Sequence, residues 1–342
     1  MYSQMGAIKN SSTIKLKEQS SLVNNYPLVL LTAQQYYKEL INEFEFATSR
    51  IKLCTMNITF GSLMDSLHAR LINALKRGVS VELVIDKYSL FRFKEGEALN
   101  FKHKSITIKR LNELKINGAK VRIIGSIGLN PFAHRMHTKL TIIDNTLYGF
   151  GGINFEEDAF SSNDIMFKLT DKKFLVPALS VLEAIKRGDM GNSEIEISSN
   201  YSILVDGGKP KDSIIYKRAC DLAKSSRDIF LSSRMCPSGV LGNIIKANEG
   251  VCYFNRPSLA SFPTNISIVL DQLKTGIDNK YKGDRFLHSK FILFKNSDGT
   301  KSFLCGSNNF NWRGVKYGTK EIAIYSKDVN VWNSLYDYMI KL

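Results

Sequence analysis

Apolar and polar positions alternate along the first half of the chain in a way that predicts strands followed by helices. Apolar runs rich in Val, Ile and Leu predict strands over 27–32, 50–56, 79–86 and 120–125. Apolar residues spaced near 3.6 predict helices over 33–49, 61–78 and 111–119. This order predicts an α/β fold with mostly parallel or mixed sheets that are covered by helices.

The same order of elements returns after about residue 190. Strands are predicted over 201–207, 227–233, 250–254 and 287–295, and helices over 212–226, 239–248 and 265–276. The stretches "ATSRIKLCTM" and "AKSSRDIFLSSRM" echo each other at matching places, which favours a duplication. We therefore expect a flexible polar segment over 1–25, a first lobe over 26–188 and a second lobe over 189–342.

One polar signature occurs once in each half. It consists of a histidine, a lysine two residues later, an apolar run, a glycine-bearing turn with an asparagine, and an acidic residue about thirty residues after the histidine. The first copy comprises His137, Lys139, Asn154 and Asp164, and the second comprises His288, Lys290, Asn309 and Glu321. A single copy fits an ordinary strand with polar ends, whereas the agreement of two copies points to a shared site.

The spacing of this signature suits phosphoryl transfer. A histidine and a lysine two residues apart on a strand point to the same face, so both can reach one anionic group. If two such sets face each other, one neutral imidazole can attack phosphorus and the opposing imidazolium can protonate the leaving oxygen. Lysine and asparagine donors would stabilise the phosphoryl oxygens, and an acidic side chain on the other ring nitrogen would fix the tautomer. This chemistry needs no metal and no cofactor.

The two copies resemble the HKD motifs of the phospholipase D superfamily. The resemblance implies two α/β/α sandwich lobes related by a pseudo-twofold axis, with one composite site at their junction, and a phosphohistidine intermediate. It assigns catalytic roles to the histidines, lysines and asparagines named above. It also implies a supporting role for Asp144 and a histidine-orienting role for Asp164 in the first lobe and Glu321 in the second.

The second copy departs from the motif at one position. Lys295 stands where the counterpart of Asp144 is expected, five residues after Lys290. The absence of the aspartate predicts a second half that contributes less to activity. In one interpretation that lobe is inactive and is kept only as a scaffold. The chain would then be a catalytically impaired homologue that binds lipid or nucleic acid.

The charge of the chain points to an anionic partner. Lys and Arg number 47 against 32 Asp and Glu, a formal net charge of +15. Five scattered cysteines argue against a disulfide framework or a zinc site, and no apolar run is long enough to span a membrane. These features predict a cytoplasmic protein, or one bound peripherally to a membrane. The mixed basic and aromatic stretches 87–96 and 101–110 are candidate anchors for a membrane or a nucleic acid. A chain with both copies needs no second subunit and no obligate protein partner.

The residues that follow the first copy favour a lipid substrate. The stretch "GGINFEEDAF" is similar to the cardiolipin synthase and bacterial phospholipase D branch. The resemblance implies hydrolysis of a phospholipid headgroup or transfer of a phosphatidyl group to an alcohol. The alternative is a nuclease, or nucleic-acid phosphodiesterase, that uses the same histidines.

Overall fold

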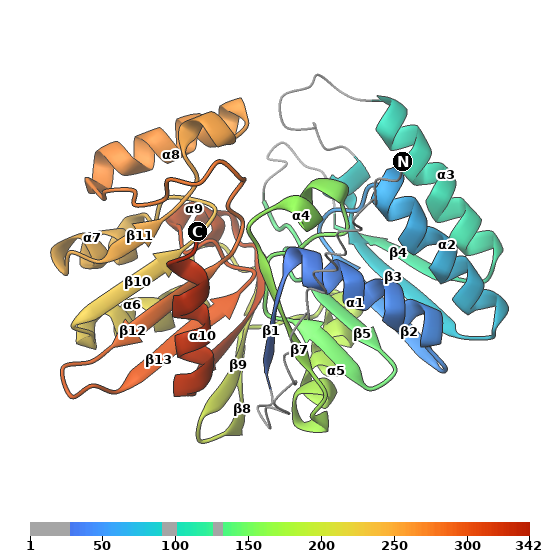
Figure 1. Ribbon diagram of the computed structural model, residues 1–342, viewed down its shortest axis with the longest axis horizontal. Coiled ribbons are helices and arrows are strands. Elements are labelled where there is room, and N and C mark those ends of the chain that lie inside the picture. Colours follow the sequence, from blue (N-terminus) through green and yellow to red (C-terminus); the bar gives the residue numbers. More distant parts are fainter. Residues whose placement is uncertain (1–27, 91–100, 126–132) are drawn as a thin grey trace, which may run out of the picture.

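The computed structural model describes residues 28–90, 101–125 and 133–342, which fold around two mixed sheets of seven strands each (Figure 1). The predicted flexible segment 1–25 and most of the candidate anchor 87–96 lie outside the described residues. In order across the first sheet, the strands are β1 (Val29–Thr32), β7 (Ile165–Leu169), β6 (Thr146–Gly149), β5 (Leu140–Ile143), β2 (Arg50–Thr55), β3 (Ser80–Asp86) and β4 (Lys120–Ile124). In order across the second sheet, they are β11 (Val251–Tyr253), β10 (Asp228–Ser232), β12 (Phe291–Lys295), β13 (Lys301–Gly306), β14 (Lys320–Ser326), β9 (Tyr201–Gly207) and β8 (Ser193–Ser198).

The two sheets repeat one topology. Strands β1, β7, β6, β5, β2 and β3 correspond in order to β9, β14, β13, β12, β10 and β11. Each sheet then adds one strand of its own, β4 beyond β3 in the first and β8 beyond β9 in the second. The duplication predicted from the sequence is thus present in the order of the strands, and the α/β class with mixed sheets is confirmed.

The expected predominance of parallel pairs is wrong. Three of the 12 strand pairs are parallel, namely β2–β3, β3–β4 and β10–β11. Antiparallel neighbours dominate because the chain leaves each motif strand through a short turn, from β5 to β6 and from β12 to β13. A parallel pair would need a crossover of a dozen or more residues at that point.

Ten helices of the described residues cover the sheets. They are α1 (Ala33–Phe46), α2 (Ser62–Lys76), α3 (Phe101–Ile116), α4 (Glu157–Ser161), α5 (Lys172–Arg187), α6 (Ile214–Ser225), α7 (Gly239–Ala247), α8 (Phe262–Thr275), α9 (Trp312–Tyr317) and α10 (Val329–Met339). Single 3-10 turns lie at Lys87–Leu90 and Pro257–Leu259. The candidate anchor 101–110 belongs to α3, which begins ten residues before the helix predicted from its apolar spacing. Within the described ranges, no helix is both long and apolar enough to cross a membrane.

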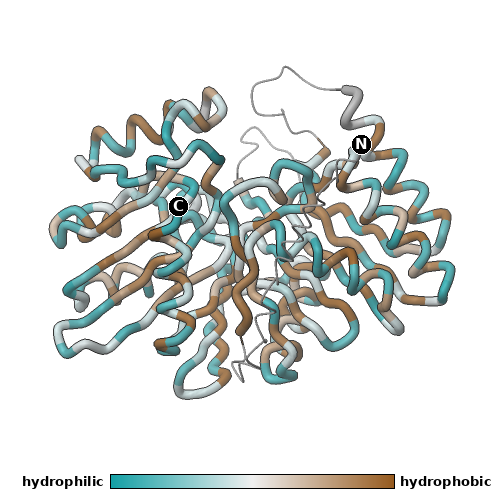
Figure 2. Tube along the Cα trace, in the orientation of Figure 1, coloured by the Kyte–Doolittle hydropathy of each residue, from teal (hydrophilic) through white to brown (hydrophobic). Residues whose placement is uncertain are grey.

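A shared core joins the two halves. Helices α5 and α10 pack with the inner faces of both sheets in one apolar cluster, whereas α1 and α2 cover the outer face of the first sheet and α6 and α7 that of the second. Helix α5 also contacts β8 of the second sheet, and α10 contacts β1 of the first. Figure 2 shows apolar strands, coloured brown, in the middle of the molecule where the two sheets meet. The lobe boundary expected near residue 188 stays a prediction.

Candidate active site

The two motif histidines lie where the sheets meet, and each is aligned by the opposite half of the chain. The backbone N–H of His137 donates to the carbonyl of Lys320 at 2.9 Å, and that of His288 donates to the carbonyl of Asn163 at 2.9 Å. Short parallel bridges pair Met136 with Lys320 and Asn163 with Leu287. Each histidine therefore enters the site beside the residue that precedes the acidic side chain of the other half.

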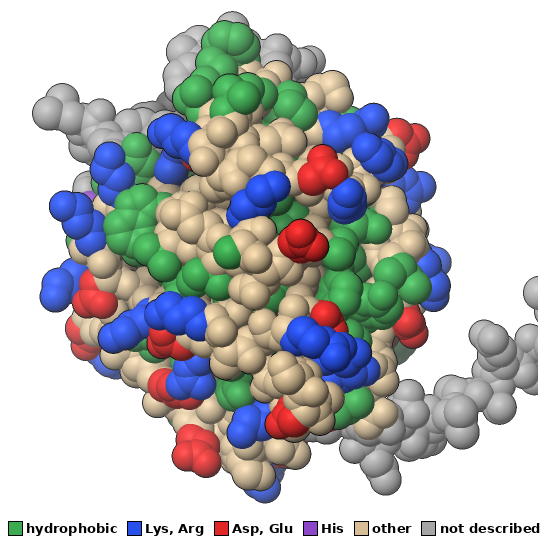
Figure 3. All heavy atoms as spheres, turned by 90° about the vertical axis from the view of Figure 1, so that its left-hand side faces the viewer, with side chains coloured by type: hydrophobic (Ala, Val, Ile, Leu, Met, Phe, Trp, Pro, Cys, Tyr) green, Lys and Arg blue, Asp and Glu red, His purple; other side chains and the backbone are tan. Residues whose placement is uncertain are grey.

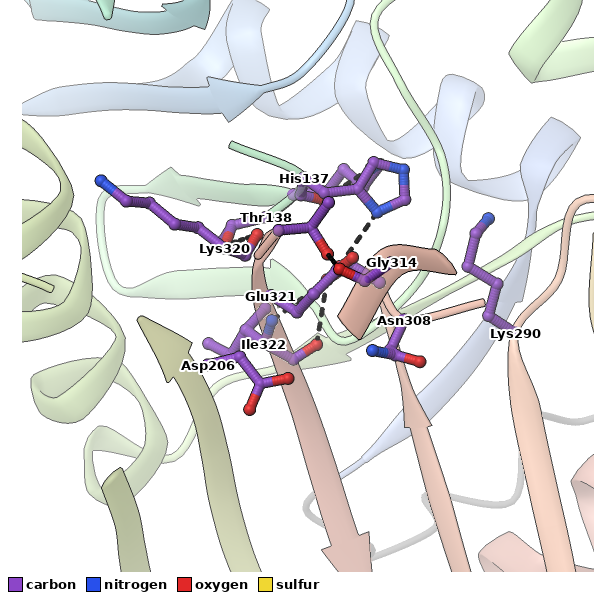
Figure 4. A network of polar contacts seen from close by, with 12 residues as sticks. His137, Thr138, Asp206, Lys290, Asn308, Gly314, Lys320, Glu321 and Ile322 are labelled. Carbon is purple, nitrogen blue, oxygen red and sulfur yellow. Dashed lines mark hydrogen bonds and ion pairs between the residues drawn. The ribbon is translucent and has the colours of Figure 1, made fainter. Parts of the chain in front are cut away.

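The imidazole–carboxylate pairs are crossed between the halves. His137 Nδ1 lies 3.0 Å from Glu321 Oε2, and His288 Nδ1 lies 2.7 Å from Asp164 Oδ2. Figure 4 shows the His137 ring joined to Glu321, with the Lys290 side chain rising from the start of β12. Each acid thus contacts the histidine of the other half and not that of its own copy of the motif, because β7 and β14 each begin beside the segment that leads into the motif strand of the opposite half.

The carboxylates leave the second ring nitrogen of each histidine available for chemistry. A hydrogen bond from Nδ1 to a carboxylate fixes the tautomer in which Nε2 carries a free electron pair. Burial lowers the pKa of His137 to about 4 against the opposing effect of Glu321, and burial with Lys290 lowers the pKa of His288 well below its ordinary value. Both imidazoles are therefore neutral at neutral pH before an anionic substrate enters.

Both motif lysines are almost fully buried beside the histidines. Lys139 Nζ donates to the carbonyl of His137 at 2.6 Å, and Lys290 Nζ donates to the carbonyl of His288. Burial lowers the pKa of Lys139 to about 8 and that of Lys290 to about 7, although nearby carboxylates favour the charged forms. Two buried cations without full hydration attract an anion strongly, since an anionic ligand restores the stabilisation lost on burial.

The two carboxylates differ in their surroundings. Burial raises the pKa of Asp164 to about 6. For Glu321, burial acts in the same direction, but His137, Lys139 and the Ser307 hydroxyl together hold its pKa below the ordinary value. Glu321 therefore stays ionised to lower pH than Asp164 does, so the acid that pairs with His137 is the more strongly ionised of the two.

Small residues in the two glycine-bearing turns give the acids and lysines their room. A Cβ atom on Gly152 would lie 2.5 Å from Lys290 Nζ and 2.6 Å from Asp164 Oδ2, so a larger residue there would displace both groups. Ser307 takes the matching place in the second turn, where its hydroxyl donates to Glu321 Oε2. Because the Ser307 hydroxyl lowers the pKa of Glu321 and Gly152 has no such group, this difference accounts for part of the difference between the pKa values of the two acids.

The motif asparagines follow these turns. Asn154 is buried, donates to Glu156 Oε1 at 3.3 Å and accepts from the Thr55 hydroxyl at 3.4 Å. Asn309 is partly buried, and its backbone carbonyl accepts from the Ser233 hydroxyl at 2.8 Å. Its side-chain oxygen is buried without a hydrogen-bond partner among residues 28–90, 101–125 and 133–342. The role of both amides as donors to a phosphoryl group stays a prediction.

Asp144 lies at the far end of β5 and does not contact the histidines or the lysines. It accepts hydrogen bonds from the backbone N–H and hydroxyl of Thr48 and Ser49 and from the backbone N–H of Arg50. These hydrogen bonds hold its pKa far below the ordinary value even though partial burial opposes them. Its support is structural: it fixes the start of β2.

Lys295 accordingly removes nothing from the second half of the site. It ends β12, where its carbonyl accepts from the backbone N–H of Arg227 at 3.0 Å and its ammonium lies 3.6 Å from Asp228. The Ser226 hydroxyl donates to Asn296 Oδ1 at 3.3 Å in the same corner. The hairpin is thus closed by other contacts, and the weakening expected from this substitution has no counterpart in the geometry of the site.

The substitution Asp144→Ala is therefore expected to lower the free energy of unfolding by about 1–3 kcal/mol, because several donors lose a charged acceptor at once. Activity per folded molecule should stay within about twofold of the parent, since no group near phosphorus is changed. Urea denaturation and active-site titration measure the two effects separately. A large loss of turnover in fully folded protein would place Asp144 in the catalytic machinery instead.

Two further polar residues position the histidines, and neither was predicted from the sequence. Asp86 ends β3 and accepts from the backbone N–H of Met136 at 2.6 Å, while its other oxygen pairs with Arg135 at 2.8 Å. Asn255 follows β11 and accepts from the backbone N–H of Leu287 at 2.7 Å. A polar residue at the end of β3 and another shortly after β11 were the available signal, because polar residues are unusual in buried positions.

No group of three or more His, Cys, Asp or Glu side chains in the described part of the chain is placed to hold a metal ion. All five cysteines are free and buried. The groups that converge on the junction are therefore imidazoles, ammonium groups, carboxylates and amides.

A match to a protein family by sequence and a match to a solved structure by fold agree with each other. Residues 40–185 match the family described as "Cardiolipin synthase, PLD-like domain". Over 92% of this chain and 85% of the other, the fold matches the crystal structure of phosphatidylserine synthase from Haemophilus influenzae Rd KW20, with a TM-score of 0.67 at 11% identity. Residues 40–185 of the chain therefore belong to a phospholipase D-like family. Members of the phospholipase D superfamily are generally phosphodiesterases or phosphatidyltransferases.

Two curated proteins match part of the chain. Cardiolipin synthase B of Shigella flexneri is 28% identical over 141 residues, which cover 39% of this chain and 30% of that protein. An uncharacterized protein of Helicobacter pylori (strain J99) is 32% identical over 133 residues, which cover 38% of this chain and 24% of that protein. The chain thus spans between 24% and 30% of the length of these relatives.

Proposed function

We propose that this protein cleaves or transfers the phosphodiester of a phospholipid through a phosphohistidine intermediate, without a metal. The proposal is carried by the crossed imidazole–carboxylate pairs, His137 with Glu321 and His288 with Asp164, next to two buried lysines. This set supplies a nucleophile, an acid–base group and cationic stabilisation at one point.

In the first step, His137 Nε2 donates its electron pair to phosphorus and the P–N bond forms as the bond to the leaving oxygen breaks. His288 transfers a proton from Nε2 to that oxygen, so a neutral alcohol leaves. Lys139 and Lys290 stabilise the charge on the non-bridging oxygens. The bound phosphodiester anion raises the pKa of His288, which takes up a proton from solvent as the substrate binds and carries it into this step as an imidazolium.

In the second step, His288, now neutral, takes a proton from water or from an acceptor alcohol. The resulting oxygen nucleophile attacks phosphorus, and the P–N bond breaks with its electron pair returning to His137 Nε2. Water gives hydrolysis and an alcohol gives phosphatidyl transfer. The site returns to its starting protonation in either case.

The assignment of His137 as nucleophile follows from the asymmetry of the two pairs. His137 has a single close partner at Nδ1, the ionised Glu321, and this favours a fixed tautomer. His288 Nδ1 lies close to Asp164 and also 3.1 Å from Lys290 Nζ. Three groups that exchange protons suit an acid–base role better than a nucleophilic one.

Phospholipid is the favoured substrate class for two reasons. The matched family and the Shigella flexneri relative carry the name cardiolipin synthase, and the sequence after Asn154 is similar to that branch. The formal charge of +15 suits an anionic lipid surface. The charge suits nucleic acid equally, so the comparison of substrates decides between them.

The test is to incubate the protein with phosphatidylglycerol vesicles, phosphatidylcholine vesicles, single-stranded DNA and double-stranded DNA in the presence of EDTA. We expect products from phosphatidylglycerol: phosphatidic acid and glycerol by hydrolysis, or cardiolipin and glycerol by transfer. Mass spectrometry identifies them, and His137→Ala protein is the control. Cleavage of DNA alone would replace the proposal with a nuclease, and no product from any substrate would favour an impaired binding protein.

A further inference from the structure

Helix α8 turns an apolar stripe toward solvent. Its exposed hydrophobic side chains are spaced at helical intervals along one face, and they are Phe262, Ile266, Val269, Leu270 and Leu273. Phe262 and Leu273 are 77% and 76% exposed. Five exposed large hydrophobics on one helix form a continuous patch, unlike the single exposed residues found on any protein surface.

The buried side of α8 is the more polar one. Ile268 is buried, but one turn away the buried residue is Asp271, which pairs with Arg313 of α9 at 3.0 Å. A surface helix usually has this arrangement reversed, with charge outward and an apolar face inward. The ion pair holds the Asp271 side of α8 against α9, and this leaves the apolar face toward solvent.

The stripe begins at the edge of the active site. At the first turn of α8, the Thr264 hydroxyl is 3.4 Å from Arg234 Nη2. The Arg234 guanidinium lies 5.5 Å from the centre of the Phe286 ring, which stacks on His288 with 5.9 Å between ring centres. Three contacts thus connect the start of the stripe to a motif histidine.

Basic side chains surround the other end of the stripe. Lys274 is exposed in the last turn of α8, and Lys246 reaches the adjacent Gly276. Lys280 and Lys282 follow in the next loop, which also carries Asp278, paired with Lys280 at 2.7 Å, and Asp284. Figure 3 shows hydrophobic side chains gathered at the top of this side of the molecule with Lys and Arg below them. Apolar residues flanked by lysines are the pattern of a helix that lies in the interface of an anionic bilayer.

We infer that α8 docks the protein on an anionic lipid bilayer, with its apolar stripe in the headgroup–acyl boundary and its lysines on the lipid headgroups. The inference rests on the proposed function, because it brings the site to its lipid. Docking through α8 turns the His288 side of the junction toward the membrane surface. Substrate then reaches the site from the bilayer without crossing bulk water.

The test compares two double variants in vesicle co-sedimentation. Phe262→Ser with Leu273→Ser removes the most exposed stripe residues, and Phe46→Ser with Ile116→Ser removes residues that are 77% and 84% exposed on other helices. We expect the α8 variant to bind vesicles of phosphatidylglycerol and phosphatidylcholine at least tenfold more weakly, and the control pair to bind like the parent. An equal loss of vesicle binding in both double variants, or no loss in either, would overturn the assignment of α8 as the docking surface.

Two further measurements separate docking from catalysis and from self-association. On a short-chain, water-soluble phosphatidylglycerol, the α8 variant should keep parental turnover, while on vesicles it should lose turnover in step with binding. Vesicle binding by a parent protein that cleaves no lipid would refute the proposed function and leave docking intact. The alternative is that a second copy of this chain covers the stripe, and sedimentation velocity without lipid tests it. A parent dimer that the α8 substitutions dissociate would show self-association and overturn the docking of α8 on lipid.

Discussion

His288→Ala protein mixed with an aryl phosphodiester is expected to accumulate a phosphoenzyme on His137. An aryl oxide leaves without protonation, so the first step proceeds while His288 is missing. The second step needs a base to activate water, and without it the intermediate persists. We expect release of about one equivalent of aryl oxide in a burst, followed by turnover about a hundredfold or more below that of the parent. Acid-labile, base-stable phosphate on residue 137 identifies the intermediate by mass spectrometry.

His137→Ala protein is the matched control for this experiment. It should give no burst and no covalent phosphate, with turnover reduced by about four orders of magnitude or more because nothing replaces the nucleophile. Burst and covalent label in His137→Ala protein, together with none in His288→Ala protein, would reverse the two roles. The fold should survive both changes, and circular dichroism checks this.

Glu321→Gln should impair the first step far more than Asp164→Asn does. Glutamine keeps the shape of the side chain but no longer holds the His137 tautomer with Nε2 free, and the comparable loss in other histidine–carboxylate pairs is about 10⁴-fold. Asp164→Asn changes the group that pairs with His288, so its loss should appear with alkyl leaving groups that need a proton and shrink with aryl ones. Burst rates for the two leaving groups measure both effects.

A double-mutant cycle tests the crossing itself. If Glu321 acts through His137, the variant carrying His137→Ala and Glu321→Gln should be no slower than His137→Ala alone. In the same cycle with Asp164→Asn, the double variant should turn over more slowly than His137→Ala protein. Strict additivity for Glu321 with His137, or an Asp164→Asn effect on the burst rate that is equally large for aryl and alkyl leaving groups, would contradict the crossed pairing.

The sequence predicted the parts of the site that depend on local geometry. A period of two places Lys139 beside His137 and Lys290 beside His288, and a second copy in a duplicated half implies that both serve one centre. The superfamily and the mixed α/β fold followed from the same residues. What each candidate residue does in catalysis stays a prediction.

The remaining features depend on tertiary contacts that no local pattern encodes. The crossing follows from the bridge between Met136 and Lys320, which joins segments far apart in the chain. Asp144 has motif spacing from Lys139, but a four-residue strand carries it to the other end of the sheet. The apolar face of α8 has the spacing of a core helix, and only the fold tells whether that face is covered.

The crossed carboxylates also constrain how this chain can change over evolutionary time. Asp164 and His288 are 124 residues apart, and Glu321 and His137 are 184 residues apart, yet the two members of each pair are in hydrogen-bond contact. A substitution of either acid changes the surroundings of the histidine in the other half, so under the proposed mechanism neither duplicate is free to drift while its sister preserves activity. The usual fate of a duplicated segment, in which one copy decays or acquires a new task, is thereby closed to both halves.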